Sequence, residues 1–148
     1  MPKVSVVMPS YNHALYVNRS IQSVLKQSFS DYEFLIADDG STDRTQDVIA
    51  QIDDKRIKFF PHPNNRGACV VHNELIERAT GEYIALINSD DVWVENKLER
   101  QVAFLDQNPR IAAHFGRAFY IDADDNILKK ESISFGSVFD QPNRTQAE

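Results

Sequence analysis

Short apolar runs alternate with helix-like segments along most of this chain, and this alternation restricts the fold more than any other feature of the sequence. Four runs have the composition and length of buried strands: 4–8, 32–37, 57–60 and 82–88. Strands that alternate with helices form a mostly parallel sheet with helices on both faces. A fifth strand is expected within Ile111–Ile121, followed by a short antiparallel strand near Ile127–Lys129. The sequence therefore predicts a three-layer α/β/α fold.

The segments between these runs are expected to be helical. Ser41 or Thr42 can cap the second helix, and Gly81 suits the C-terminal stop of the third. Cys69 is the lone cysteine, so it cannot form an internal disulfide, and we expect a packed core thiol in the third helix. The helices are placed by their apolar residues: Leu15, Ile21, Val24 and Leu25 in the first, Val48, Ile49 and Ile52 in the second, then Ala68–Ala79 and about Glu95–Asp106.

The composition is that of a globular domain with an acidic balance. At 148 residues, 42% of them hydrophobic, the chain is long enough for one domain with a real core. A net charge of −6 argues against general affinity for nucleic acid or an anionic membrane, although a local basic patch stays open. No run approaches the ~20 apolar residues of a membrane span, and the first strand begins without a signal peptide. We expect a cytoplasmic protein that meets a membrane only peripherally, if at all.

Two pairs of adjacent aspartates end two of the predicted strands. Asp38-Asp39 follows the second apolar run, and Asp90-Asp91 follows the fourth. Ligand sites of parallel α/β sheets lie just beyond the carboxyl ends of the strands. Like charges repel there unless a cation lies beside them, and a divalent metal with a phosphate is the obvious partner. The alternatives are structural: Asp90 and Asp91 could cap the next helix, and Asp39 could only support the turn at Gly40.

Two further loops are expected near this edge of the sheet. Pro9 and Tyr11 lie in the loop after the first strand, and Arg66 lies in the loop 61–67 before a helix. An arginine beside a helix N-terminus suits a phosphate group. Arg66 could instead be a solvated loop charge, and Tyr11 a core aromatic. Trp93 follows the second aspartate pair and is expected to pack beneath the site, with contact to a sugar as the alternative.

Other kinds of site lack their sequence signatures. No GxGxxG follows the first strand, which disfavours a dinucleotide site, and no GxxxxGK[ST] is present, which disfavours a P-loop nucleotidase or kinase. The histidines have no metal-ligand spacing, and we expect all of them to be structural or on the surface: His13, His62, His72 and His114.

Six short motifs follow one another along the chain: VSVVMPSYN at 4–12, SIQSVLKQS at 20–28, DDGSTD at 38–43, NNRG at 64–67, ATGEYI at 79–84 and NSDD at 88–91. In this order they resemble the N-terminal half of family 2 glycosyltransferases, particularly the bacterial spore-coat polysaccharide type. The resemblance covers about 2–108. It implies a GT-A fold, with a Rossmann-like nucleotide-binding half joined to an acceptor-binding half. The chain is interpreted as that first half, a single domain over 1–148 whose pattern weakens after about Ser134.

The resemblance implies that the loops after the first and second strands bind the nucleoside of a nucleotide-diphosphate sugar. Pro9 and Tyr11 would line the nucleoside pocket, with Tyr11 near the base. Asp39 would accept a hydrogen bond from the base, most often uracil, with Asp38 close by. Arg66 would lie near the base or the phosphates.

The resemblance also implies different tasks for the second pair of aspartates, as the family's variant of the DxD motif. Asp90 would contact the ribose, and Asp91 would bind Mn²⁺ or Mg²⁺ that bridges the diphosphate. A metal held by one carboxylate and two phosphates is a usual arrangement for Mg²⁺. As a Lewis acid it stabilises the charge that grows on the departing nucleoside diphosphate.

The predicted function is sugar transfer from a UDP-sugar to an acceptor hydroxyl, with inversion, in polysaccharide or cell-envelope glycan synthesis. Inverting enzymes use a carboxylate as base for the acceptor, and the resemblance places this residue beyond Glu148. The acidic residues of the last segment carry no base motif and are interpreted as solvated turn charges: Asp122, Asp124, Asp125, Glu131 and Asp140. The sugar, the acceptor and a homodimeric state stay open.

Two other functions stay open at this point. A non-catalytic sugar-nucleotide-binding module without the acceptor domain would fit the missing base. A phosphoryl-transfer or receiver-type domain would also use acidic pairs, but it needs an aspartate where the first strand ends in Pro9-Ser10-Tyr11. The residues therefore favour a donor-binding domain over a receiver domain.

Overall fold

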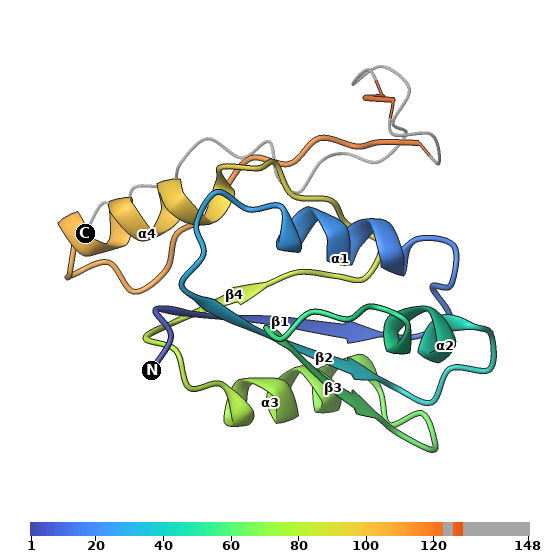
Figure 1. The fold of residues 1–148 in the computed structure, drawn as a ribbon. Coiled ribbons are helices and arrows are strands. Elements are labelled where there is room, and N and C mark those ends of the chain that lie inside the picture. Colours follow the sequence, from blue (N-terminus) through green and yellow to red (C-terminus); the bar gives the residue numbers. More distant parts are fainter. Residues whose placement is uncertain (123–125, 129–148) are drawn as a thin grey trace, which may run out of the picture. The chain divides into compact units, whose positions relative to one another are not determined.

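Four parallel strands in the order β3-β2-β1-β4 form the predicted sheet (Figure 1). The computed structural model describes residues 1–122 and 126–128, and the chain divides into two compact units, 1–112 and 113–148. The first unit contains these elements: β1 (Val4–Ser10), α1 (Val17–Leu25), β2 (Tyr32–Asp38), α2 (Thr45–Ala50), β3 (Ile57–Pro61), α3 (Ala68–Arg78), β4 (Tyr83–Leu86) and α4 (Lys97–Gln107). The predicted parallel α/β architecture is confirmed.

Helices cover both faces of the sheet because successive side chains of a strand point to opposite faces. Val6 and Met8 of β1 pack in one cluster with side chains of α1, α2 and α4. Val7 packs on the other face with Val71 and Leu75 of α3. Figure 1 shows α1 and α3 on opposite sides of the sheet. The three layers are therefore those predicted from the alternation of strands and helices.

The chain reverses its direction across the sheet after β3. β1, β2 and β3 are consecutive neighbours, and α3 then carries the chain back to β4 on the other side of β1. Parallel crossovers are right-handed, so this reversal places α3 on the face opposite α1 and α2. It also creates a switch point at the carboxyl ends of β1 and β4, where open α/β sheets bind their ligands.

The starts of α1 and α2 correct two expectations. Leu15 does not join the apolar face of α1, because the helix begins at Val17 and the Leu15 side chain is 88% exposed. Neither Ser41 nor Thr42 caps α2, which begins at Thr45 without a hydrogen bond from a capping side chain. The Ser41 hydroxyl donates instead to Asp38, so the loop after β2 is folded onto its own strand.

α3 corrects two more expectations. Cys69 is exposed, because α3 buries the positions of Val71 and Leu75 and turns Cys69 away from the sheet. Gly81 is not the stop of α3, which ends at Arg78 with Ala79 already extended. Gly81 lies against β1, where an added Cβ would come within 2.5 Å of the Ser5 nitrogen. The glycine is therefore required by close packing of two backbones.

β4 is shorter and less buried than the run 82–88 predicts. Its outward positions Ile84 and Leu86 are 43% and 56% exposed. The reason is its place at one edge of the sheet, since α3 packs against β1 and β2. The interpretation of this run as a fully buried strand is wrong on that face.

The predicted fifth strand within Ile111–Ile121 is also wrong. Residues 111–120 have no regular secondary structure, and a single antiparallel bridge joins Ile121 to Ile127. The run is apolar, but Phe115 is 88% exposed, so it does not pack as a strand within its unit. Lys129, Asp124, Asp125, Glu131 and Asp140 lie outside the described residues. Within the described part of the chain, no helix has the length and apolar character needed to cross a membrane.

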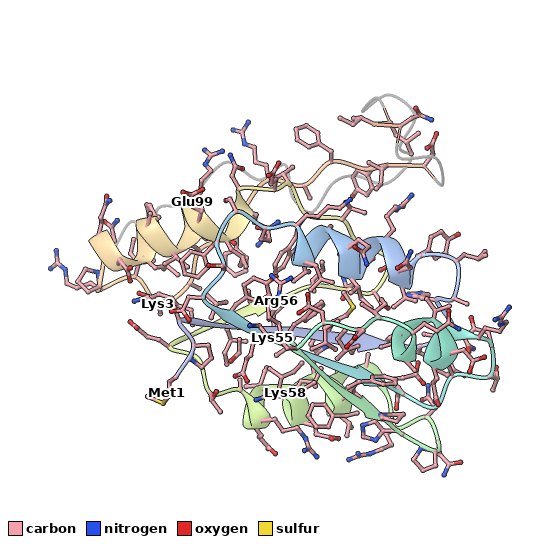
Figure 2. All side chains as sticks on the ribbon, viewed as in Figure 1. Met1, Lys3, Lys55, Arg56, Lys58 and Glu99 are labelled. Carbon is pink, nitrogen blue, oxygen red and sulfur yellow. The ribbon has the colours of Figure 1, made fainter. Side chains whose placement is uncertain are left out.

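A buried carboxylate forms a hydrogen-bond network near the amino ends of the strands. Glu33 of β2 accepts hydrogen bonds from the Ser5 hydroxyl (2.6 Å), the Thr80 amide (2.8 Å) and the Lys58 ammonium (2.7 Å). Burial alone would raise the pKa of Glu33, but these donors outweigh it and lower the pKa to about 2. Figure 2 shows Lys58 and Lys3 where β3 and β1 begin. Glu33 thereby fixes the turn between α3 and β4 to the sheet.

Candidate functional site

Three loops meet at the carboxyl edge of the sheet, as the strand order predicts. The Asn12 amide donates to the Ser41 hydroxyl (2.9 Å), which joins the loop after β1 to the loop after β2. The His13 ring contacts the Ser89 hydroxyl (2.7 Å), which joins the loop after β1 to the loop after β4. Asn12 has a left-handed backbone with φ of 52°, a conformation that asparagine tolerates better than most residues. The loop after β1 therefore connects the two aspartate-bearing loops.

Asp38 is fully buried at the end of β2 and organises its loop. Its carboxylate accepts hydrogen bonds from the Ser41 amide (2.8 Å), the Ser41 hydroxyl (2.5 Å) and the Gln46 side chain (2.7 Å). These donors replace the water that a charged carboxylate would lose on burial. Any contribution of Asp38 to a ligand would therefore pass through the loop that it holds.

Asp39 holds the loop before α3. One of its oxygens accepts from the Arg66 amide (2.7 Å) and the other from the Gly67 amide (2.8 Å). Gly40 makes this approach possible: its φ is +71°, and an added Cβ would lie 2.5 Å from the Asn64 carbonyl carbon. Asp39 thus supports the loop across from it as well as its own turn. A carboxylate has about four lone-pair positions, so two bonds leave acceptor capacity.

The Arg66 side chain is partly exposed and already has an acidic partner. Its Nη1 lies 2.8 Å from a Glu74 oxygen and 3.1 Å from the His62 ring. Arg78 binds the other oxygen of the same Glu74 carboxylate at 3.0 Å. A guanidinium has five N–H donors, so contact with one carboxylate leaves donors for a further anion. The structure brings the Arg66 backbone to Asp39, while its side chain extends along α3.

Asp90 and Asp91 are both exposed beyond the end of β4. They do not cap α4, which begins six positions after Asp91 at Lys97 with Asn96 as its cap residue. One Asp91 oxygen accepts from the Asn88 side chain (3.0 Å), and the Asp91 amide donates to the Asn88 carbonyl (3.2 Å). Among the described residues, no lysine or arginine forms an ion pair with either carboxylate. Two adjacent carboxylates thus face solvent at the switch point.

The remaining candidates also lie at this edge. Pro9 is partly buried in β1 opposite Ala37, and the Tyr11 side chain is 42% exposed just beyond the strand. Tyr11 is therefore not a core aromatic. Trp93 packs against the main hydrophobic cluster, as expected for a residue beneath the site, and the Lys97 ammonium lies 4.1 Å from the centre of its ring.

The sequence did not reveal how the loops are held together. Asp43 accepts hydrogen bonds from the Thr45 amide and hydroxyl and from the Ala14 amide. Burial opposes ionisation of Asp43, but these bonds outweigh it and lower its pKa. The sequence predicts only that His13 is structural or on the surface, and a lone histidine does not indicate a contact with Ser89. These hydrogen-bond partners depend on how the loops approach one another in space, and the spacing of residues along the sequence does not predict this.

The acidic residues suit a hard divalent cation only with help from a ligand. Among residues 1–122 and 126–128, no three His, Cys, Asp or Glu side chains gather into a metal-binding group. Asp91 offers carboxylate oxygens, the donor type that Mg²⁺ and Mn²⁺ prefer. One or two carboxylates with substrate phosphates would complete such a site. The donor set therefore fits a metal that arrives with a phosphate ligand.

Comparison with known proteins identifies the family. The profile of glycosyl transferase family 2 matches residues 5–147. The chain belongs to this family. It is 40% identical over 105 residues to WfgD of Escherichia coli, a UDP-Glc:alpha-D-GlcNAc-diphosphoundecaprenol beta-1,3-glucosyltransferase, and this match covers 71% of the chain. It is 44% identical over 106 residues, 70% of the chain, to TuaG of Bacillus subtilis, a putative teichuronic acid biosynthesis glycosyltransferase.

Solved structures similar to this chain are GT-A glycosyltransferases. The S. aureus TarS structure in complex with UDP has a TM-score of 0.68 and 30% sequence identity, over 72% of this chain and 33% of that one. The mostly parallel α/β sheet of this chain is thus that of a GT-A glycosyltransferase. The chain spans 42% of WfgD, 42% of TuaG and 54% of a related glycosyltransferase from Haemophilus influenzae. It therefore spans about half the length of these relatives.

Proposed function

We propose that this chain binds the nucleotide-diphosphate sugar of a family 2 glycosyltransferase that works in cell-envelope polysaccharide synthesis, with a UDP-sugar as donor. The observation that carries the proposal is the exposed pair Asp90-Asp91 at the switch point of the GT-A sheet. The names of WfgD and TuaG support an envelope glycan as the product, and the UDP complex of TarS supports the nucleotide. A cytoplasmic location and a homodimer are further expectations that go with this proposal.

The loops after β1 and β2 would bind the nucleoside. Tyr11 is exposed beside the end of β1 and would lie against the base, with Pro9 lining the pocket. Asp39 would use its spare acceptor capacity for the base N–H while it holds the Arg66 and Gly67 amides. Asp38 would act through Ser41, and the free donors of Arg66 would face the base or the phosphates.

The loop after β4 would hold the ribose and the diphosphate. Asp90 would contact the ribose, and Asp91 would supply a carboxylate oxygen to Mn²⁺ or Mg²⁺ together with phosphate oxygens. Such a metal supplies Lewis-acid stabilisation of the departing diphosphate. Asp91 itself would provide a carboxylate that has no cationic partner among the described residues, at the position where the metal and the phosphates would bind. The base for the acceptor hydroxyl would lie outside this chain. Asp122 accepts a hydrogen bond from the Asn126 amide within its own turn, as expected for a turn charge.

Nucleotide titration with and without metal tests the proposal. We expect UDP to bind more tightly in Mn²⁺ than in chelator by isothermal titration calorimetry, and Asp91→Asn to remove most of the difference. Asp53→Asn is a matched control, because Asp53 is also exposed but lies between α2 and β3 at the other end of the strands. No binding of any nucleoside diphosphate, with or without metal, would contradict the proposal.

Donor hydrolysis separates binding from catalysis. If the pure chain binds UDP-sugars but neither hydrolyses nor transfers them, the chain alone is a donor-binding module. Release of UDP that depends on Asp91 would show that the bound metal already weakens the glycosidic bond. An equal rate of release in Asp91→Asn would contradict the role given to this carboxylate.

A further inference from the structure

Ser89, the residue directly before the aspartate pair, is held at two of its atoms by the segment around α1. Its hydroxyl lies 2.7 Å from His13 Nδ1, and its carbonyl accepts from the Ser20 hydroxyl at 2.8 Å. Ser89 is only 2% exposed, although Asp90 and Asp91 after it are exposed. The chain therefore leaves the interior at a fixed point just before the two carboxylates.

His13 is itself fixed by its backbone. Its amide donates to the Thr45 hydroxyl (2.9 Å), and its carbonyl accepts from the amides of Tyr16 and Val17 (2.9 Å each) where α1 begins. The ring also makes an edge contact with Tyr16, with centroids 6.1 Å apart. A side chain whose backbone is fixed at both ends loses less freedom when it forms one more bond. The imidazole is thus already oriented towards Ser89.

We propose that His13 is a positioning residue for the carboxylates of Asp90 and Asp91, acting through the hydroxyl of Ser89. This inference rests on the proposed donor-binding function and deepens it. His13 does not touch the ligand. It connects the loop that would bind the nucleoside to the loop that would bind the diphosphate, so that both are held at one spacing.

The chemistry of a site with a single protein carboxylate makes such positioning matter. A metal with many protein ligands is centred by their number, whereas one carboxylate must meet the cation and two phosphates by its own placement. Groups that orient a metal ligand without touching the metal change metal affinity by about 10–100-fold when removed. Asp91 has one side-chain partner among the described residues, Asn88 of its own turn, so its place depends on the backbone that Ser89 anchors.

A structural role without functional consequence is the alternative, and three variants separate the two. His13→Leu removes the hydrogen-bonding ring nitrogen and keeps the apolar bulk. His13→Asn keeps a polar group near the position of Nδ1 that can pair with a hydroxyl as donor or acceptor. His72→Leu makes the same change on α3, away from the His13–Ser89 contact.

The first measurement needs no ligand. Amide hydrogen exchange over 88–93 reports the turn in which the Asp91 amide donates to Asn88. We expect exchange there to rise about tenfold in His13→Leu and to stay at the wild-type rate in His13→Asn and His72→Leu. Wild-type exchange in His13→Leu would overturn the inference, whatever the nucleotide does.

The second measurement asks whether the loop matters for the metal-dependent ligand. UDP affinity in Mn²⁺ should fall about tenfold in His13→Leu, and UDP affinity in chelator should change less than twofold. His13→Asn should restore the metal-dependent part. Equal losses with and without metal would overturn the inference, because they would place His13 in nucleoside binding or general stability. If the wild type shows no metal-dependent binding, the proposed function fails, and the exchange experiment still decides the role of His13.

A double-mutant cycle tests whether His13 acts through the Ser89 hydroxyl. Ser89→Ala should reproduce the loss in metal-dependent affinity, and the double variant His13→Leu/Ser89→Ala should lose no more than either single variant. Residues that act through one hydrogen bond are non-additive in this way. Additive losses would overturn the claim that His13 acts through the Ser89 hydroxyl.

Discussion

Both ends of the sheet carry carboxylates, but the carboxylate at the amino end is buried and hydrogen-bonded, whereas the pair at the carboxyl end is exposed. At the amino end, Glu33 is 7% exposed and is surrounded by donors from Ser5, Lys58 and Thr80. At the carboxyl end, Asp90 and Asp91 are exposed. A carboxylate with a full set of partners has nothing left to offer a ligand. An exposed carboxylate with few partners keeps its charge and its lone pairs available for a ligand.

Asp38 and Asp39 lie between these extremes. Both are almost fully buried, yet their donors are loop amides and side chains at the ligand-facing edge. Their charge therefore shapes loops, whereas that of Glu33 fixes a turn to the sheet. The comparison predicts that substitutions at the amino end change stability alone. Substitutions of the buried aspartates change stability and binding together, and substitutions of the exposed pair change binding alone.

Glu33→Ala should produce the largest loss of stability. It leaves the fully buried Ser5 hydroxyl without its acceptor, and an unsatisfied buried group costs about 1–3 kcal/mol. It also removes the acceptor of the Thr80 amide and the ion pair with Lys58. We expect the free energy of unfolding to fall by about 3 kcal/mol in urea titrations. UDP affinity, measured where the variant is still folded, should be unchanged. A weaker affinity in the folded variant would break the separation between the two ends.

The pH dependence of stability should also come from the amino end. The pKa of Glu33 is about 2 in the folded protein and near the ordinary glutamate value of 4.5 when unfolded. Its contribution is therefore complete above about pH 4.5 and is lost as the pH falls from 4.5 towards 2. Glu33→Gln should flatten the acid limb of the unfolding profile. An unchanged profile in Glu33→Gln would assign the acid sensitivity to other carboxylates.

Gly40→Ala should have the next largest effect, at the carboxyl end. The alanine Cβ would meet the backbone of Asn64 at 2.5 Å, and the φ of +71° is unfavourable for any L-residue. We expect a loss of about 2 kcal/mol together with weaker UDP binding, because the loop held by Asp39 must move. Gly67→Ala is the matched control: its φ is also positive, at +95°, but nothing lies within 4 Å of the added Cβ. With a ψ of 140°, Gly67 has a backbone conformation that other residues rarely adopt, so the variant should lose about 1–3 kcal/mol from backbone strain alone, without a steric contact to Asn64.

These contrasts show which parts of the molecule the sequence could predict. The buried strands β1 and β2 are continuous apolar runs. Because the strands alternate with helices and are therefore parallel, the aspartates that follow β2 and β4 are expected at one edge of the sheet without knowledge of any contact: Asp38, Asp39, Asp90 and Asp91. The partners of these residues could not be read in this way. Which amide reaches Asp39, or which hydroxyl reaches His13, depends on how two loops approach each other.

The errors have the same physical origin. The run 111–121 has the composition of a strand, but a strand also needs a neighbour with which to pair, and composition cannot supply one. Cys69 and Leu15 are apolar but exposed, because α1 begins only after Leu15 and α3 directs Val71 and Leu75, rather than Cys69, towards the sheet. Element boundaries depend on caps and tertiary contacts that shift a helix start by a few residues. The residue types were enough to predict the three layers of the fold. Which side chains of a helix face the sheet and which face solvent could be seen only in the structure.

Asp91→Asn should have the smallest effect on stability and is the sharpest test of the comparison. The side chain is exposed and carries a charge beside the like charge of Asp90, so removal of the charge relieves repulsion and breaks no buried bond. Urea unfolding without ligand should change by no more than about 0.5 kcal/mol. In the presence of UDP and Mn²⁺, the wild type should gain stability that the variant lacks, since a ligand stabilises only the state that binds it. A large loss in the ligand-free variant would mean that Asp91 is a structural carboxylate like Glu33, and the two ends of the sheet would no longer differ.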